Sequence, residues 1–361
     1  MNYKQDTYRR LGDYIQQIDD RNIDLSVTTL LGLSMTKEFR PSTSNVVGTD
    51  LSKYKIVREG KFAFDTMSVI RVHKVPICYN NLGYPIIISP AYITFEIKDE
   101  RILNPLYLKL LTNRSEFDRY ADFKSDAAVR GGYNWDELCD TYIPIPSPEE
   151  QQRIVNDYYA IYNRIETNKQ TIVKLEEAAY ALYRKMFVED INTEDLPDGW
   201  KFGKLEELAD ISSGTSCKHK SNIKDNTYRY PVAGAAGIIG YSSDFSNEKR
   251  LLTTGRVGTL GVTCRYNEKV WYADNVLVIA PYSFEYIYQI LNNLDFNILI
   301  KFGVQSLITQ SGLKEYPILI PPSTKLNEFE EKATALFNHI DVLKKENFVL
   351  NDLLDNILNN F

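Results

Sequence analysis

An internal repeat, in which two segments 175 residues apart share one pattern, most constrains how this chain folds. The first copy starts at Ile143 with IPIPSPEEQQRI, and the second starts at Ile318 with ILIPPSTKLNEF. Each predicts a short strand ending in prolines and then a long helix, because proline neither continues a ladder nor lies inside a helix. In the first copy we expect Ser147 as N-cap, Pro148 as first helical residue and Glu150 completing a capping box.

Both predicted helices carry a narrow apolar seam. Seam residues recur at alternating spacings of four and three for more than four heptads. They are Ile154, Tyr158, Ile161, Ile165, Asn168, Ile172, Leu175, Ala179, Leu182 and Met186, then Phe329, Ala333, Leu336, Ile340, Leu343, Asn347, Leu350, Leu354, Ile357 and Phe361. So narrow a seam favours a coiled coil over a helix lying on a globular core, whose apolar face is wider.

One polar residue interrupts each seam and predicts how the helices pair. Asn168 is the fifth of ten layers and Asn347 is the sixth of ten. In a parallel pair each amide would face a hydrocarbon side chain, whereas full antiparallel overlap brings the two amides together. A buried amide with a partner fixes register, and one without a partner costs about 1 to 3 kcal/mol. We therefore predict an antiparallel coiled coil within one chain.

The rest of the sequence forms two blocks of related layout, rich in tyrosine, glycine and short β-like runs. We expect strands over 63–72, 84–95, 257–266 and 270–279, helices over 105–120 and 284–301, and a linker at 190–200. The predicted fold class is α+β, with two β-rich domains separated by the two helices. The expected boundaries are 1–146, 147–189 (first helix), 190–322 (linker and second domain) and 323–361 (second helix).

Charge is distributed unevenly along the chain. The net charge is −6, from 42 basic and 48 acidic side chains. The segments 147–195 and 323–361 hold 10 basic and 17 acidic residues, which leaves 32 and 31 in the two blocks. Within the blocks the bases cluster among Tyr, Gly and Ser, a pattern that suits contacts to phosphates and base edges. Taken alone, such clusters more often form a solvated charged face.

Motifs of the common enzyme classes are missing. The sequence has no P-loop, dinucleotide fingerprint or Gly-x-Ser-x-Gly elbow. Residues 104–107 match only part of the Asn-Pro-Pro-aromatic loop of adenine methyltransferases. Asp65, Glu96 and Lys98 loosely resemble the set of a metal-dependent nuclease, but a charged strand face and its turn is the favoured interpretation.

No pattern in the sequence points to a metal site, a disulfide framework or a membrane span. The four cysteines lie far apart without a CxxC pair, and the three histidines are scattered. No stretch is apolar enough to span a membrane, and no signal peptide is recognisable. We expect a cytoplasmic protein with reduced thiols and no metal.

Two variable blocks alternating with two similar helices resemble the DNA specificity subunit of Type I restriction-modification systems. The proline strand and capped helix, IPIPSPEEQQRI, carries the resemblance most specifically. In the second block LPDGWKFGKLEELADISSG, YPVAGAAGIIGY, LLTTGRVGTLG and WYADNVLVI are similar to that family, and in the first block FAFDTMSVI and SPAYITFEI are similar to another branch. The second helix start, IPPSTKLNEF, departs from the family pattern.

The resemblance implies that each block is a target recognition domain reading one half of a bipartite, asymmetric site in double-stranded DNA. The helices would act as spacer and dock two methyltransferase subunits, and restriction subunits would join them. The chain itself would be non-catalytic. Partners would use S-adenosylmethionine for adenine N6 methylation, and ATP and magnesium for restriction. The 32 steps from Ile154 to Met186 correspond to about 48 Å of helix, enough to separate half-sites by roughly one turn of duplex.

Basic and aromatic residues of the blocks are the candidates for DNA contact. They are Lys218, His219, Lys220, Tyr241, Arg256 and Arg265 in the second block, and Arg58, Lys61, Arg71 and Lys74 in the first. Arg256 is the best base-reading candidate, because Gly255 and Gly258 would let the backbone approach the groove.

Three other interpretations stay open at this point. The chain is equally compatible with the recognition subunit of a Type IIB-like enzyme. From other classes, it would be a metal-dependent nuclease using Asp65, Glu96 and Lys98, or a coiled-coil interaction protein with no role on DNA.

Overall fold

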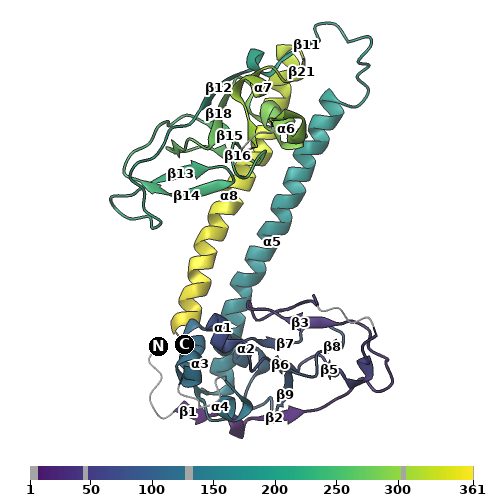
Figure 1. Ribbon diagram of the computed structural model, residues 1–361, viewed down its shortest axis with the longest axis vertical. Helices are drawn as coiled ribbons and strands as arrows, with labels where there is room; N and C mark the ends of the chain where they lie inside the picture. The colour runs from purple at the N-terminus through teal and green to yellow at the C-terminus, as the bar shows by residue number, and fades with distance from the viewer. Residues whose placement is uncertain (1–6, 44–47, 127–132, 302–305, 361) are drawn as a thin grey trace. The chain divides into compact units, whose positions relative to one another are not determined.

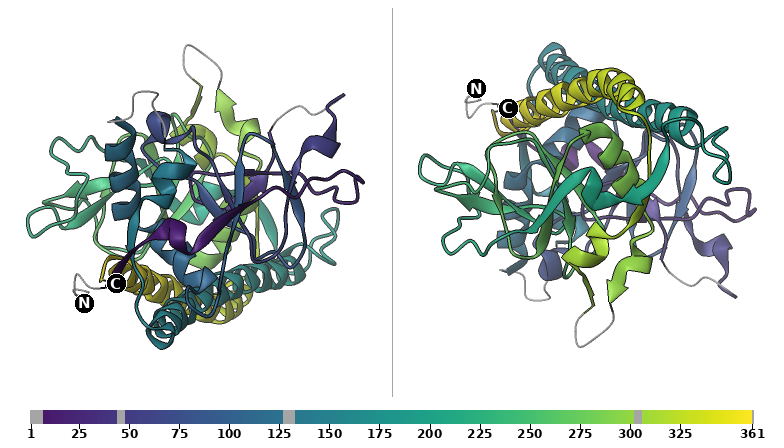
Figure 2. Two further views of the ribbon diagram at one scale, coloured as in Figure 1. Left: turned by 90° about the horizontal axis from the view of Figure 1, so that it is seen from below. Right: turned by 90° about the horizontal axis from the view of Figure 1, so that it is seen from above.

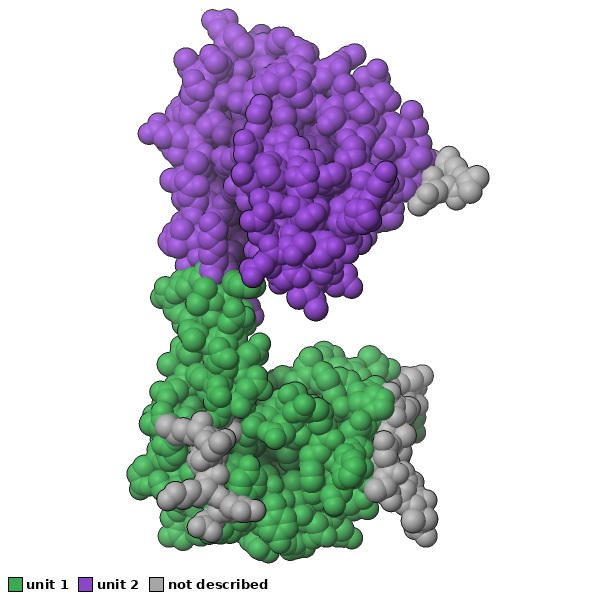
Figure 3. Space-filling view, turned by 90° about the vertical axis from the view of Figure 1, so that its left-hand side faces the viewer, with its two compact units in different colours: residues 1–167, 346–361 green, residues 168–345 purple. Residues whose placement is uncertain are grey.

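Secondary-structure elements gather into two compact units, each of which contains one end of both long helices (Figures 1 and 3). Unit 1 comprises residues 1–167 and 346–361, and unit 2 comprises residues 168–345. The computed structural model describes residues 7–43, 48–126, 133–301 and 306–360. Within these ranges no helix is both long enough and apolar enough to cross a bilayer.

The two long helices are α5 (Pro148–Phe187) and α8 (Ser323–Asn360) (Figures 1 and 2). Every predicted seam residue that the structure describes is buried or half-buried, so the seam is confirmed. Phe361 lies outside the described residues. At the start of α5 the Ser147 hydroxyl accepts from the Glu150 N–H at 3.4 Å, as expected of an N-cap. The predicted capping box is wrong, because the Glu150 carboxylate pairs with Arg153 instead.

Within each unit α5 and α8 run antiparallel, as predicted. In unit 1, Arg164 and Glu346 form an ion pair (2.9 Å), and Ile154 and Ile357 belong to the same apolar core. In unit 2, Glu176 and Lys344 form an ion pair (3.5 Å), and the ring centroids of Phe187 and Phe329 lie 5.2 Å apart. In both units the position along α5 rises as the position along α8 falls. Asn168 is buried and Asn347 is half-buried, and their mutual pairing stays a prediction.

Unit 1 is built on the four-stranded antiparallel sheet β2-β9-β6-β7, with the pairs β1-β10, β3-β4 and β5-β8 beside it. The strands are β1 (Tyr8–Arg10), β2 (Ile15–Ile18), β3 (Leu31–Leu33), β4 (Phe39–Pro41), β5 (Lys55–Val57), β6 (Phe62–Phe64), β7 (Ile77–Tyr79), β8 (Ile86–Ile88), β9 (Ile93–Ile97) and β10 (Tyr142–Pro144). The helices are η2 (Leu11–Asp13), η3 (Leu51–Lys53), α1 (Val69–Val72), α2 (Pro105–Asn113), α3 (Ser115–Asp126) and α4 (Trp135–Cys139). Its main core packs β6 and β9 against α2, α3 and the start of α5.

Unit 2 is built on the antiparallel sheet β12-β18-β15-β16 and the smaller sheet β14-β13-β17, with the pairs β11-β21 and β19-β20. The strands are β11 (Lys201–Lys204), β12 (Ala209–Ser213), β13 (Tyr230–Gly234), β14 (Gly237–Ser242), β15 (Leu251–Gly255), β16 (Thr263–Tyr266), β17 (Trp271–Tyr272), β18 (Val276–Pro281), β19 (Ile300–Lys301), β20 (Leu307–Ile308) and β21 (Pro317–Ile320). The helices are η4 (Leu205–Glu207), α6 (Phe284–Asn293), η5 (Phe296–Leu299) and α7 (Gln310–Lys314).

The units share one plan, so the related layout expected from the repeat is confirmed. In each, the first strand pairs with the proline strand before the long helix, as β1 does with β10 and β11 with β21. Both four-stranded sheets have the same strand order. The hydroxyls of Tyr107 and Tyr286, each the third residue of its helix, donate to the proline-strand carbonyls of Pro144 and Leu319.

Several expected elements are divided into two or three shorter ones. The run 63–72 ends as a strand at Phe64 and resumes as helix α1, and 84–95 holds the separate strands β8 and β9. The predicted helix 105–120 is α2 followed by α3, and 284–301 is α6, η5 and β19. Asp65 shows why the first run breaks, because its carboxylate accepts from the Met67 N–H and the Ser68 hydroxyl and so closes a turn.

Candidate nucleic-acid interface

In unit 2 a basic loop lies against the edge strand β14. Lys218, His219 and Lys220 are exposed in the segment between β12 and β13. Ser221 and Tyr241 exchange backbone hydrogen bonds of 2.9 and 2.8 Å, which ties this loop to β14. These predicted residues therefore form one surface.

Gly240 explains why the loop comes so close. Its φ is +147°, and a Cβ built there would lie 2.8 Å from the Ser221 carbonyl oxygen. Any side chain would push the loop away from β14. The Lys220 Cδ lies 3.5 Å from the same point, and the Lys224 ammonium lies 5.9 Å from the Tyr241 ring centroid. Lys224, which is not among the principal candidates, belongs to the same surface.

Arg256 follows β15 and is half-buried. Its Nη1 donates to the Ser213 hydroxyl at 3.1 Å, and Ser213 is the last residue of β12, just before the basic loop. Among the described residues the Arg256 Nε is buried without a hydrogen-bond partner. The structure thus holds this guanidinium in one place by a single neutral hydroxyl.

Gly255 has a different role from the one expected. A Cβ at this position would lie 1.9 Å from the Thr259 oxygen and 2.9 Å from the Ala235 oxygen, so the glycine serves packing inside the protein. Ala235 lies in the turn between β13 and β14. β14 therefore starts beside the loop of Arg256 and contacts the basic loop at Tyr241. It connects Arg256 with the predicted residues of the basic loop.

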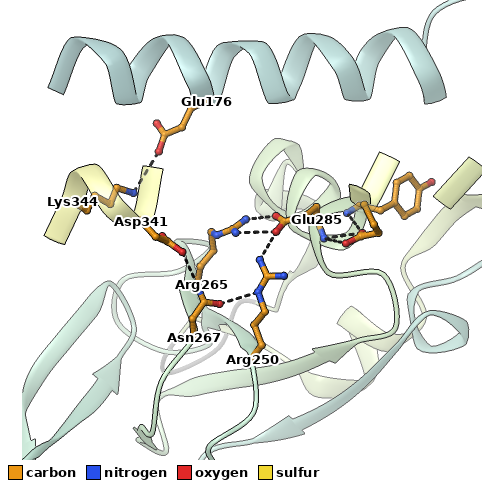
Figure 4. A network of polar contacts seen from close by, with 9 residues as sticks. Glu176, Arg250, Arg265, Asn267, Glu285, Asp341 and Lys344 are labelled. Atoms are coloured by element: carbon orange, nitrogen blue, oxygen red, sulfur yellow. Dashed lines mark hydrogen bonds and ion pairs between the residues drawn. The ribbon is translucent and has the colours of Figure 1, made fainter. Parts of the chain in front are cut away.

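Arg265 lies apart from that surface, in a buried ionic cluster (Figure 4). Its side chain is 11% exposed, and its Nη2 donates to the Glu285 carboxylate at 3.0 Å. Glu285 is fully buried and also binds Arg250. The Arg265 guanidinium lies 3.8 Å from the Phe337 ring centroid on α8. These contacts give Arg265 a place in the core, so we leave it out of the interface proposed below.

The same cluster extends to α8 through Asn267. The Asn267 oxygen accepts from Arg250 Nε at 2.9 Å, and its amide nitrogen donates to Asp341 at 2.7 Å (Figure 4). The sheet of unit 2 is thus joined to its own part of α8 by polar contacts as well as by apolar packing.

In unit 1 the predicted residues have mixed surroundings. Arg58 is exposed and pairs with Asp20 at 2.8 Å. Lys61 pairs with Glu96 at 2.6 Å, and this hydrogen bond lowers the pKa of Glu96. Lys74 is exposed. Arg71 lies in α1, and its side chain is outside the described part of the structure.

The residues of the nuclease interpretation make separate contacts. Asp65 closes the turn before α1, Glu96 pairs with Lys61, and the Lys98 ammonium donates to the Gly12 carbonyl at 2.9 Å. The described residues include no group of three or more acidic, histidine or cysteine side chains that would hold a metal ion. Asn104, the first residue of the partial methyltransferase motif, is the N-cap of α2.

The fold is that of a two-unit α+β protein in which related units share a pair of antiparallel helices. Residues 197–351 match the model of the Type I restriction modification DNA specificity domain family. The chain is 22% identical over 284 residues to the Type I restriction enzyme MjaIX specificity subunit of Methanocaldococcus jannaschii. That match covers 64% of this chain and 63% of the relative, which is less than two thirds of its length.

A solved structure has the same fold. It is the Type-I restriction-modification system S subunit from M. genitalium, with a TM-score of 0.62, 13% identity, and coverage of 99% of this chain and 97% of that one. The resemblance expected from the sequence is confirmed. The chain is similar to Type I specificity subunits, and its residues 197–351 match the model of their DNA specificity domain.

Proposed function

We propose that this chain is the non-catalytic subunit of a Type I restriction-modification complex that chooses the DNA site. Each unit reads one half of a bipartite site, and the two helices act as spacer. The halves differ in sequence because the loops of the two units differ. Methyltransferase subunits supply S-adenosylmethionine chemistry on adenine, and restriction subunits supply ATP- and magnesium-dependent cleavage.

One observation carries this proposal, namely that the same sheet order occurs twice on one antiparallel helix pair. Two copies of one plan with unlike loops suit two unlike half-sites. The loop at Lys218–Lys220 beside β14 supplies the positive charge that phosphates require. We include Lys218, His219, Lys220, Tyr241 and Arg256 in unit 2, and Arg58, Lys61 and Lys74 in unit 1.

Exposed apolar side chains on the helices support the docking of methyltransferase subunits. Their exposed fractions range from 39% to 71%, and they are Tyr162, Phe348, Val349 and Leu353 in unit 1, and Val173, Tyr180 and Val342 in unit 2. Exposed apolar groups on a helix surface suit protein-protein contacts. Because each unit carries such side chains, two partners would fit.

Mapping N6-methyladenine in the genome with and without this gene tests the proposal. We expect one methylated bipartite motif with unlike halves to disappear when the gene is deleted and to return on complementation. An unchanged methylome would contradict the proposed function. Magnesium-dependent cleavage by the purified chain alone would instead favour a nuclease.

A further inference from the structure

Strand β14 exposes two neighbouring isoleucines in the middle of the candidate interface. Ile238 is 52% exposed and Ile239 is 40% exposed. β14 is the edge strand of the sheet β14-β13-β17. Side chains alternate between the faces of a strand, so both faces of this edge present an apolar group.

The local structure holds both isoleucines in place. Ile238 pairs with Ala233 across the hairpin, and the Ile239 Cγ2 lies 2.5 Å from the point where a Cβ of Gly234 would be. Gly234 thus lets Ile239 lie directly over β13. A register shift between Pro231 and Ala233 interrupts the regular pairing of the hairpin, and such bulges increase local twist.

Positive charge surrounds this apolar edge. Residues 215–241 include four Lys or Arg residues and one acid, Asp225. The Lys220 side chain lies beside Gly240, the next residue after Ile239. A strand edge with apolar groups and flanking cations is complementary to a DNA groove, in which phosphates flank the base edges. A protein partner with an apolar surface would not need these cations.

The major groove admits a β-ribbon, and its one apolar group is the C5-methyl of thymine. We propose that the β13–β14 ribbon lies in the major groove and that Ile238 and Ile239 read thymine methyl groups. This inference rests on the proposed function and names the part of the half-site that unit 2 reads. It predicts at least one A·T pair at a fixed position in that half.

Uracil substitution tests the inference, because deoxyuridine lacks only the C5-methyl group. The full chain, purified with its co-expressed methyltransferase subunits, is titrated with duplexes carrying the mapped motif. Each thymine is replaced by deoxyuridine in turn. We expect wild-type affinity to fall by about fourfold for each methyl contact that is lost. Ile238→Ala and Ile239→Ala should bind the thymine duplex more weakly and lose that sensitivity to uracil.

Val188→Ala is the matched control, because Val188 is also 52% exposed in unit 2 but lies just beyond the end of α5. It should keep both the affinity and the uracil effect. The isoleucine variants should keep the wild-type salt dependence, since they remove no charge. Two results would overturn this inference but not the proposed function. In the first, the wild-type complex binds its site specifically and no uracil substitution weakens binding. In the second, uracil weakens binding equally in the wild type and in the isoleucine variants. Absence of sequence-specific binding by the wild-type complex would contradict the proposed function itself.

Discussion

At the residue scale, one carboxylate organises the interior of unit 2. Glu285 binds both Arg250 and Arg265, and Arg265 also contacts aromatic rings of α6 and α8. Removing the charge of a buried ion-pair partner leaves the remaining charge uncompensated. We expect Glu285→Gln to lower the free energy of unfolding by about 3 to 5 kcal/mol. Urea unfolding followed by circular dichroism measures this change.

Glu328→Gln is the matched control for that variant. Glu328 lies in unit 2 and pairs with Lys332 at 2.7 Å, but both side chains are about half-exposed. A solvent-exposed pair contributes roughly 0 to 1 kcal/mol. Equal losses in the two variants would show that Glu285 is not the centre of a buried cluster.

The example of Arg265 shows what could be predicted for single residues. The sequence displays its charge and its tyrosine-rich surroundings, but not Glu285, which lies 20 residues away and meets it only in the fold. The exposure of Lys218 and Lys220 is easier to predict, because a loop of consecutive polar residues has no apolar face to bury. Ile238 and Ile239 are not among the candidates from the sequence, because isoleucine in a strand usually indicates core.

At the element scale, a side chain of α8 caps the N-terminus of α6. The Glu330 carboxylate accepts from the N–H groups of Glu285 and Tyr286 at 2.9 and 3.0 Å. Burial raises the pKa of Glu330 above its ordinary value of 4.5. The folded protein therefore keeps a proton that the unfolded chain loses. This contribution to stability is complete below pH 4.5 and is lost as pH rises through the folded-state pKa.

Glu330→Gln keeps the two accepted hydrogen bonds and removes the titration. We expect the difference in Tm, variant minus wild type, to increase from pH 4.5 upward and to level off above the folded-state pKa. Thermal unfolding between pH 4 and 8 measures it. For Glu328→Gln the difference should stay constant above pH 4.5, because the hydrogen bond with Lys332 lowers the pKa of Glu328 and so confines its titration to lower pH. A pH-independent difference for Glu330→Gln would refute this account.

The long elements could be predicted from the sequence and the short ones could not. The seams of α5 and α8 repeat over many turns, so the period predicts both helices, and the positions of Asn168 and Asn347 within the seams predict that the helices run antiparallel. The strands are two to six residues long, and their ends depend on local turns. The turn at Asp65 and the break between α2 and α3 at Arg114 interrupt runs that hydropathy treats as continuous.

At the scale of the whole molecule, the proposed function assigns one half of the DNA site to each unit, so damage to one unit should affect one half only. Arg256 is the sharpest test, because among the described residues its guanidinium donates a hydrogen bond to the Ser213 hydroxyl alone. We expect Arg256→Ala to cost about 1 to 3 kcal/mol on the specific site and to relax specificity in one half only. Methylome sequencing of cells carrying the variant shows which positions become degenerate.

Lys218→Ala is the companion variant, because an exposed lysine on a loop suits a phosphate contact. It should weaken binding on specific and random duplexes alike and reduce the salt slope by about 0.9. Both variants lie in unit 2, but they should change different quantities. Arg256→Ala should change the methylated motif, and Lys218→Ala should change the salt dependence of binding. If Arg256→Ala weakens binding equally on random DNA, Arg256 contacts a phosphate. If it degrades both halves of the motif together, the units do not read their half-sites independently, and the division of labour inferred from the repeat is wrong.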